Sequence, residues 1–143
     1  MPPDPFNLAR FLDAQSSTYT TALAELRAGC KRTHWIWFIF PQVSGLGLSS
    51  TSQFYAIRSR AEAAAYLAHP VLGPRLRECT DAILQHPQKT AAEIMGHPDD
   101  LKLRSSMTLF SALTSADSPF HLVLDRWFDS PDERTLAFLA HEQ

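Results

Sequence analysis

The chain has 143 residues, of which 45% are hydrophobic and 20% charged, and its formal net charge is -2. This composition excludes an intrinsically disordered chain, and the slight acidity gives no electrostatic basis for binding along nucleic acid, although a local basic patch around a pocket is compatible with it. We expect a single helical domain over residues 1–143, with its core in residues 5–140 and no nucleic-acid partner.

The sequence predicts a cytoplasmic protein that makes no membrane contact. Its longest uninterrupted apolar run, residues 35–41, is far shorter than the ~20 residues that span a bilayer. The N-terminal MPPDPFNLAR lacks the layout of a secretory signal. Cys30 and Cys79 are far apart and form no C-x-x-C pattern, which indicates two free thiols in a reducing compartment.

Helical spacing of apolar residues, interrupted by capping residues and prolines, predicts about seven helices joined by short loops. The first stretch covers residues 8–26, with a break near residues 16–18 left open, and ends at Gly29. Capping-box patterns at Ser59/Glu62 and Thr90/Glu93 begin later helices, and Ser118 and Asp132 cap the last two. The fold class is therefore all-α, a compact multihelical domain.

The segment THWIWFIFPQ, residues 33–42, is the most aromatic part of the chain. Its composition favours a buried strand, but no other segment offers a pairing partner, and a lone strand would leave backbone groups unsatisfied. Thr33 can act as an N-cap, and Pro41 would end the turn. Because a short helix that is apolar all round is a buried helix, we predict a central apolar helix here.

The polar ends and the tryptophans of this segment are candidates for a ligand pocket. His34 and Gln42 would lie at the pocket rim, although His34 is equally explained as a cap or a satisfied core histidine. Trp35 and Trp37 cannot both point one way on a helix, so at least one belongs to the core. The other could stack on a nucleobase.

Three further segments supply candidate contacts to an anionic ligand. The segment SGLGLSSTSQFY, with Ser49 and Tyr55, could cradle phosphate, although any helix N-terminus has this composition. Arg75 could grip an anion or be solvated surface. Lys102 and Ser105 lie on successive turns of one helix, where the hydroxyls indicate either tight packing or polar contacts in a pocket.

The histidines are scattered, and none is paired at i, i+4, so the sequence predicts no metal site and no cofactor.

Three segments together resemble a family of small, mostly bacterial proteins, the domain-of-unknown-function family 1810. They carry the motifs HWxWFxFPQ, HPxLGxRL and KLRSSMTLF in this order, and the resemblance extends from about Phe6 to Leu139. It implies a multihelical all-α fold and no established activity. Some members carry the label calpastatin, but such inhibitors are disordered and repeat-rich, so this compact apolar sequence excludes that label.

A more distant similarity, carried by Lys102, Met107 and Phe110, links the chain to the NADAR superfamily. The similarity implies a pocket for a nucleotide-like ligand, ADP-ribose or an NAD-derived compound, and a reaction at an N-glycosidic bond. Hydrolysis needs a general base, and the sequence offers no obvious carboxylate pair. Candidates by elimination are Asp99, Asp100 and Asp132. The alternative is a noncatalytic protein-interaction module whose partners the sequence does not identify.

Overall fold

The protein is described by a computed structural model covering residues 3–141, which contain ten helices and no strand beyond one isolated bridge. The all-α prediction is confirmed. The helices are α1 (Ala9–Ser16), α2 (Tyr19–Ala28), α3 (Ile36–Ile39), α4 (Ser50–Phe54), α5 (Arg60–Ala68), α6 (Leu72–Leu84), α7 (Ala91–Met95), α8 (Asp99–Ser111), α9 (Pro119–Trp127) and α10 (Glu133–His141).

The predicted count of about seven helices was too low, because short helices form where local capping permits them. The first predicted helix is divided into α1 and α2 at Ser17 and Thr18. In the Gly-rich segment, the Ser49 hydroxyl accepts a hydrogen bond from the Ser52 N–H at 3.1 Å and begins the single turn of α4. No long-range periodicity marks such a turn in the sequence.

Most of the helix caps predicted from the sequence are confirmed. Thr90 and Glu93 form a complete capping box at α7. Ser59 and Ser118 cap α5 and α9 with their hydroxyls. The capping box predicted for Ser59 and Glu62 is only half formed, because the Glu62 carboxylate accepts from the Arg58 N–H and from Arg10 instead. Gly29 ends α2 in the left-handed conformation, with φ of 76°, which favours glycine because it has no Cβ.

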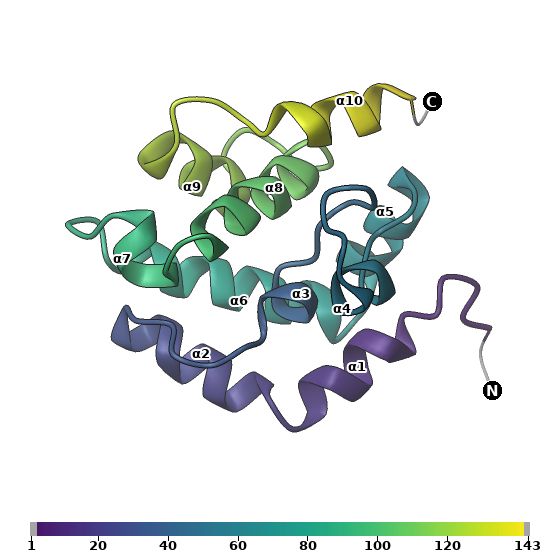
Figure 1. Cartoon of the computed structure of the whole chain (residues 1–143), viewed down its shortest axis with the longest axis horizontal. Coiled ribbons are helices and arrows are strands. Elements are labelled where there is room, and N and C mark those ends of the chain that lie inside the picture. Colours follow the sequence, from purple (N-terminus) through teal and green to yellow (C-terminus); the bar gives the residue numbers. More distant parts are fainter. Residues whose placement is uncertain (1–2, 142–143) are drawn as a thin grey trace.

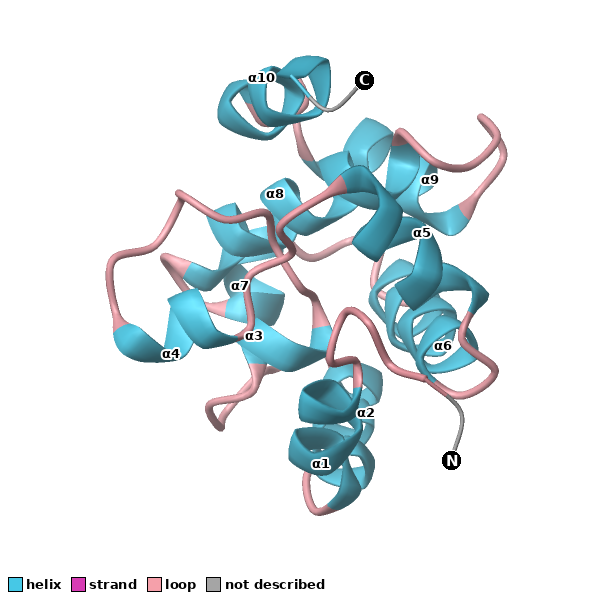
Figure 2. Ribbon diagram, turned by 90° about the vertical axis from the view of Figure 1, so that its right-hand side faces the viewer, coloured by secondary structure: helices cyan, strands magenta, loops and turns pink. Residues whose placement is uncertain are grey.

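Helix α8 is central, and it packs against α3, α5, α7, α9 and α10 (Figure 1). Helix α6 lies behind it and packs against α2, α5 and α9. Figure 1 places α1 and α2 along one edge of the molecule and α10 along the opposite edge. In both views α4 lies beside α3, so the loop that carries α4 covers the flank of the central helices (Figure 2).

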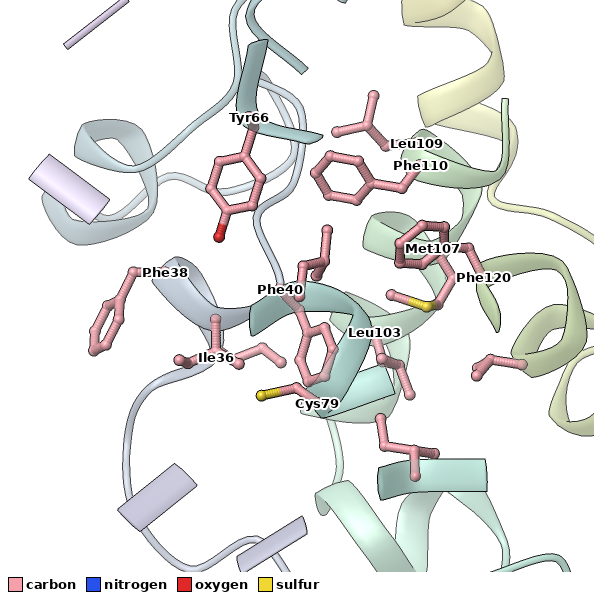
Figure 3. Packing of buried hydrophobic residues seen from close by; sticks show 14 of the residues in the cluster. Ile36, Phe38, Phe40, Tyr66, Cys79, Leu103, Met107, Leu109, Phe110 and Phe120 are labelled. Atoms are coloured by element: carbon pink, nitrogen blue, oxygen red, sulfur yellow. The ribbon is translucent and has the colours of Figure 1, made fainter. Parts of the chain in front are cut away.

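The core is built from aromatic and aliphatic side chains that converge on α8 (Figure 3). The rings of Tyr66 and Phe110 lie 5.6 Å apart between centroids, and Phe120 continues the row at 5.8 Å from Phe110. Both pairs are tilted, and aromatic pairs at such distances add ~0.5–1.5 kcal/mol each beyond the burial of their area. Burial also raises the pKa of the Cys79 thiol to about 12, so this cysteine stays protonated and unreactive.

Within the segment THWIWFIFPQ the predicted buried helix is present but short: it covers Ile36–Ile39, and Ile36, Phe38 and Ile39 lie in the core. The N-cap prediction for Thr33 was wrong. Helix α3 begins after Trp35 without a side-chain cap, because the Thr33 hydroxyl instead donates to Glu25 Oε2 at 2.7 Å. A carboxylate from α2 therefore fixes the turn that leads into α3.

Within residues 3–141, no helix is long and apolar enough to cross a bilayer. The same part of the chain holds no cluster of three His, Cys, Asp or Glu side chains suited to a metal ion. Cys30 and Cys79 are both free thiols.

Candidate functional site

A cavity of about 300 Å³ lies between the α4 loop and the helices α3 and α8. We call it the aromatic cavity, because a tryptophan and a tyrosine form part of its lining. It is lined by Trp37, Gln42, Val43, Leu46, Gly47, Leu48, Ser49, Ser52, Tyr55, Ala56 and Lys102. Most of these residues come from one continuous segment, residues 42–56, so the geometry of that loop decides the shape of the cavity.

The loop is closed at its base by a short parallel bridge between Val43 and Ile57. The Ser44 N–H donates to the Ile57 carbonyl at 2.9 Å, and the Ile57 N–H donates to the Gln42 carbonyl at 2.8 Å. Because backbone hydrogen bonds join the two ends of the loop, the residues between them form an ordered cavity wall despite their high Gly and Ser content.

Arg10 anchors the far side of the loop from within the protein. Its guanidinium donates to the carbonyls of Phe54 and Ala56 at 2.8 and 3.0 Å and to Glu62 Oε2 at 2.6 Å. Both side chains of the ion pair are 5% exposed. This contact has no signal in the sequence, because Arg10 lies beside polar residues on its own helix face and its partners are more than 40 residues away.

Two lysines share one carboxylate next to the cavity. Asp99 accepts from Lys31 Nζ at 2.8 Å and lies 3.3 Å from Lys102 Nζ. Lys102 lies 5.3 Å from the Trp37 ring centroid, and Lys31 lies 4.9 Å from that of Trp35. Both contacts are cation–π interactions. Since one negative charge faces two positive charges, this cluster carries a net positive charge at the cavity wall.

The structure brings five of the nine predicted binding residues together in the aromatic cavity, namely Trp37, Gln42, Ser49, Tyr55 and Lys102. The two tryptophans diverge, as the helical periodicity requires: Trp37 lines the cavity, whereas Trp35 is fully buried.

Four of the predicted residues lie outside this cavity. Trp35 donates its indole N–H to Glu25 Oε1 at 2.9 Å, so its polar atom is already bound in the core. His34 is exposed on the turn before α3 and does not line the cavity. Arg75 donates to the Gln15 side chain at 3.3 Å and stacks over the Tyr19 ring at 4.6 Å. Ser105 lines an adjoining cavity, and its hydroxyl donates to the Leu101 carbonyl at 3.2 Å.

The hydroxyl groups of the Gly-rich loop serve its own backbone. Ser49 Oγ donates to Ser52 Oγ at 3.0 Å, and Ser52 Oγ donates to the Ser49 carbonyl at 2.9 Å. Gly47 lies directly against this pair, because a Cβ at position 47 would be 2.4 Å from Ser52 Oγ. These contacts make the loop a capped turn, and they do not resemble a ring of N–H groups around a phosphate.

The carboxylates considered for catalysis have structural partners. Asp99 pairs with the two lysines, and Asp100 lies 2.9 Å from His97 Nδ1. Asp132 accepts from the N–H and hydroxyl of Thr135 at 2.9 and 2.6 Å, which caps α10 as predicted. No Asp, Glu or His is found among the described residues that line the aromatic cavity.

Comparison with known proteins gives a family and a structural relative. The model of a family described as protein of unknown function (DUF1810) matches residues 5–139. The crystal structure of the conserved hypothetical protein Rv1873 from Mycobacterium tuberculosis is similar, with 51% sequence identity and a TM-score of 0.93. The match covers 96% of this chain and 99% of that one. No curated protein matches.

Proposed function

Since the chain belongs to the DUF1810 family of proteins of unknown function, we propose a function from its own cavity: binding of a nucleotide-like small molecule, ADP-ribose or an NAD-derived compound. The observation that carries the proposal is the pairing of an aromatic ring and a cation, Trp37 and Lys102, on one wall of a preformed cavity. This arrangement offers a face for a planar ring next to a charge for a phosphate.

The size and lining of the cavity support a ring-containing ligand. Its volume of about 300 Å³ lies at the lower end of the ~300–1,000 Å³ found for small-molecule sites. Trp37 and Tyr55 supply aromatic faces, and Gln42 supplies an amide that can both donate and accept hydrogen bonds. Stacking of a base on an aromatic side chain contributes ~1–3 kcal/mol.

Lys102 is the group available to an anion. Its side chain is 32% exposed, whereas that of Lys31 is 6% exposed. Asp99 is already bound by Lys31, so a phosphate that approaches Lys102 does not leave Asp99 unpaired. The net positive charge of the three groups favours such an anion.

The proposal is one of binding without hydrolysis. Cleavage of an N-glycosidic bond needs a base that activates water, and the described lining of the aromatic cavity supplies no carboxylate or imidazole. The carboxylates nearby cap helices or pair with lysines. Binding of the ligand is therefore the function that this geometry supports best.

A thermal-shift measurement tests the proposal. ADP-ribose, NAD and AMP are added at millimolar concentration, and a ligand at ~100 times its Kd stabilises the folded state by ~2.7 kcal/mol. For a chain of this size, that corresponds to a rise in Tm of about 5–10 °C. Trp37→Phe is expected to reduce the rise. Trp127→Phe is the matched control, because Trp127 is also half-buried but does not line the aromatic cavity. No rise with any of the three compounds overturns the proposal.

Variants at the two lysines separate a binding role from a structural one. Lys102→Met is expected to weaken ligand binding and to change the free energy of unfolding by less than ~1 kcal/mol, because partly exposed ion pairs contribute little. Lys31→Met is expected to cost ~2 kcal/mol, since it removes the more buried of the two cations that pair with Asp99 together with the donor to the Thr33 carbonyl. Urea unfolding and ligand titration give the two readouts. A large stability loss for Lys102→Met with unchanged binding would make Lys102 structural.

A protein-interaction module is the second candidate, and the exposure of Leu48 favours it. This side chain is 91% exposed at the rim of the aromatic cavity, and Phe54 on the same loop is 52% exposed. Leu48→Ser distinguishes the candidates. Weaker binding of the small molecule means that Leu48 covers the ligand, whereas unchanged binding means that it does not and leaves this apolar surface available to a protein partner.

A further inference from the structure

We infer that a second, basic cavity continues the aromatic cavity and binds a second anionic group of the ligand, so that the preferred ligand carries a diphosphate. This inference rests on the proposed function. It adds two arginines, Arg104 on α8 and Arg134 in the first turn of α10, which neither the sequence patterns nor the family description assigns to a site.

The two cavities are contiguous. The basic cavity has a volume of about 290 Å³ and shares Gln42, Leu46 and Lys102 with the aromatic cavity. Its other lining residues are Pro98, Leu101, Arg104, Ser105, Asp132 and Arg134. Because Lys102 lines both, a phosphate bound at its ammonium group lies at the junction, and a second phosphate attached to the first would enter the basic cavity.

Charge distinguishes the basic cavity from the aromatic one. Its lining holds three cations, Lys102, Arg104 and Arg134, and one anion, Asp132, which leaves a net charge of +2 (3 − 1). Counting Asp99, which pairs with Lys102, still leaves +1. The whole chain has a net charge of -2, so this positive charge is a local concentration. A diphosphate has the charge to balance it.

Arg104 is held in place before any ligand arrives. Its Nε donates to the Ser130 carbonyl at 2.8 Å, and its Nη2 donates to Ser130 Oγ at 2.8 Å and to the Pro131 carbonyl at 2.9 Å. All three acceptors are neutral, so these bonds orient the guanidinium without neutralising it. Nη1 takes no part in them. A fixed guanidinium binds phosphate with less loss of side-chain entropy than a mobile one.

The segment that holds Arg104 is itself fixed to α8. The Asp132 N–H donates to Thr108 Oγ1 at 2.9 Å, and Thr108 is buried. Arg134 follows in the first turn of α10 and is exposed. The basic cavity therefore combines one arginine held by three hydrogen bonds with one exposed arginine, and both can donate to an anion bound there.

Isothermal titration of the full chain tests the inference with adenosine, AMP, ADP, ADP-ribose and inorganic pyrophosphate. ADP is expected to bind about tenfold more tightly than AMP, because it adds charge-assisted hydrogen bonds. Arg134→Gln should remove this advantage and leave AMP binding within about twofold of the original. Since Arg134 is exposed, this variant is expected to fold. Arg32→Gln is the matched control, because Arg32 is also exposed but lines neither cavity.

The outcomes separate this inference from the proposed function. Equal affinities for AMP and ADP, or an ADP advantage that persists in Arg134→Gln, overturn the basic cavity and leave the aromatic cavity intact. If no nucleotide binds but pyrophosphate does, and Arg134→Gln weakens it, the basic cavity is supported and the nucleotide proposal fails. If neither nucleotides nor pyrophosphate bind, both are overturned.

Discussion

Glu25 shows how one side chain orders the approach to the candidate site. Its carboxylate accepts hydrogen bonds from the backbone N–H groups of Arg32 and Thr33, from the Thr33 hydroxyl and from the Trp35 indole. Burial acts to raise the pKa of Glu25, but these hydrogen bonds outweigh it and lower the pKa to about 2. The turn that places Trp35 in the core, and Trp37 two residues later in the cavity, therefore depends on an ionised carboxylate.

We expect Glu25→Gln to lower the free energy of unfolding by ~1–2 kcal/mol at pH 7. The Gln amide oxygen would face the same N–H and O–H donors, but it is a weaker hydrogen-bond acceptor than the carboxylate. The pKa of Glu25 falls on folding from 4.5 to about 2. The stabilisation it provides is therefore fully present above pH 4.5 and is lost as the pH falls toward 2. Urea unfolding from pH 7 to pH 2.5 should show the two proteins converging in acid. A difference that is the same at every pH would rule out this role.

At the level of secondary structure, the motif HPxLGxRL forms the junction between α5 and α6, where the backbones of the two helices come into close contact. His69 Nδ1 accepts from the N–H groups of Val71 and Leu72 at 3.1 and 3.2 Å, which begins α6 immediately after α5. A Cβ at Gly73 would lie 2.1 Å from the Leu67 carbonyl oxygen. Because that atom belongs to the backbone of α5, it cannot move aside as a side chain does.

Gly73→Ala is therefore expected to destabilise the protein by ~3 kcal/mol, near the upper end of what overpacking costs. Gly45→Ala provides the comparison: a Cβ there meets nothing within 4 Å, but φ is 93°. That variant bears only the strain of the left-handed backbone, ~1–2 kcal/mol. Chemical denaturation of both variants measures the difference. Equal stabilities for the two would mean that α5 and α6 can separate without cost.

At the scale of the whole molecule, the buried pair of Arg10 and Glu62 connects three regions of the chain. Arg10 on α1 donates to the carbonyls of Phe54 and Ala56 in the cavity loop and to Glu62 on α5. It also donates to the carbonyls of Phe6 and Asn7 in the N-terminal segment. Five hydrogen bonds from one guanidinium thus join the N-terminus, the cavity loop and the helical core.

Arg10→Met is expected to cost ~3–5 kcal/mol, since it leaves Glu62 buried without its cation. The double variant Arg10→Met, Glu62→Leu should recover part of this stability, because both charges are then removed. Ligand binding should stay impaired in it, as the carbonyls of the cavity loop still lack their donor. Unfolding and titration of the same samples give the two results. Full recovery of both would show that the loop holds its shape without Arg10.

Most of the helices could be predicted from local sequence, because caps and apolar periodicity act within a few residues. Thr90, Ser118 and Gly29 cap their helices as predicted. The same local reasoning identified α3 as a buried helix and required its two tryptophans to diverge. It did not find α4, because a single turn has no periodicity to detect.

Which side chains meet depends on how the helices pack, and the sequence does not show this. Trp37 and Lys102 are 65 residues apart (102 − 37) and face one cavity, whereas Arg75, which looked equally available, is held by Gln15. The shared carboxylate of Asp99 and the two arginines of the basic cavity have no spacing signature in the chain. Helix formation is set by neighbours in sequence, but a binding site is set by how helices pack, and packing depends on contacts between residues far apart in the chain.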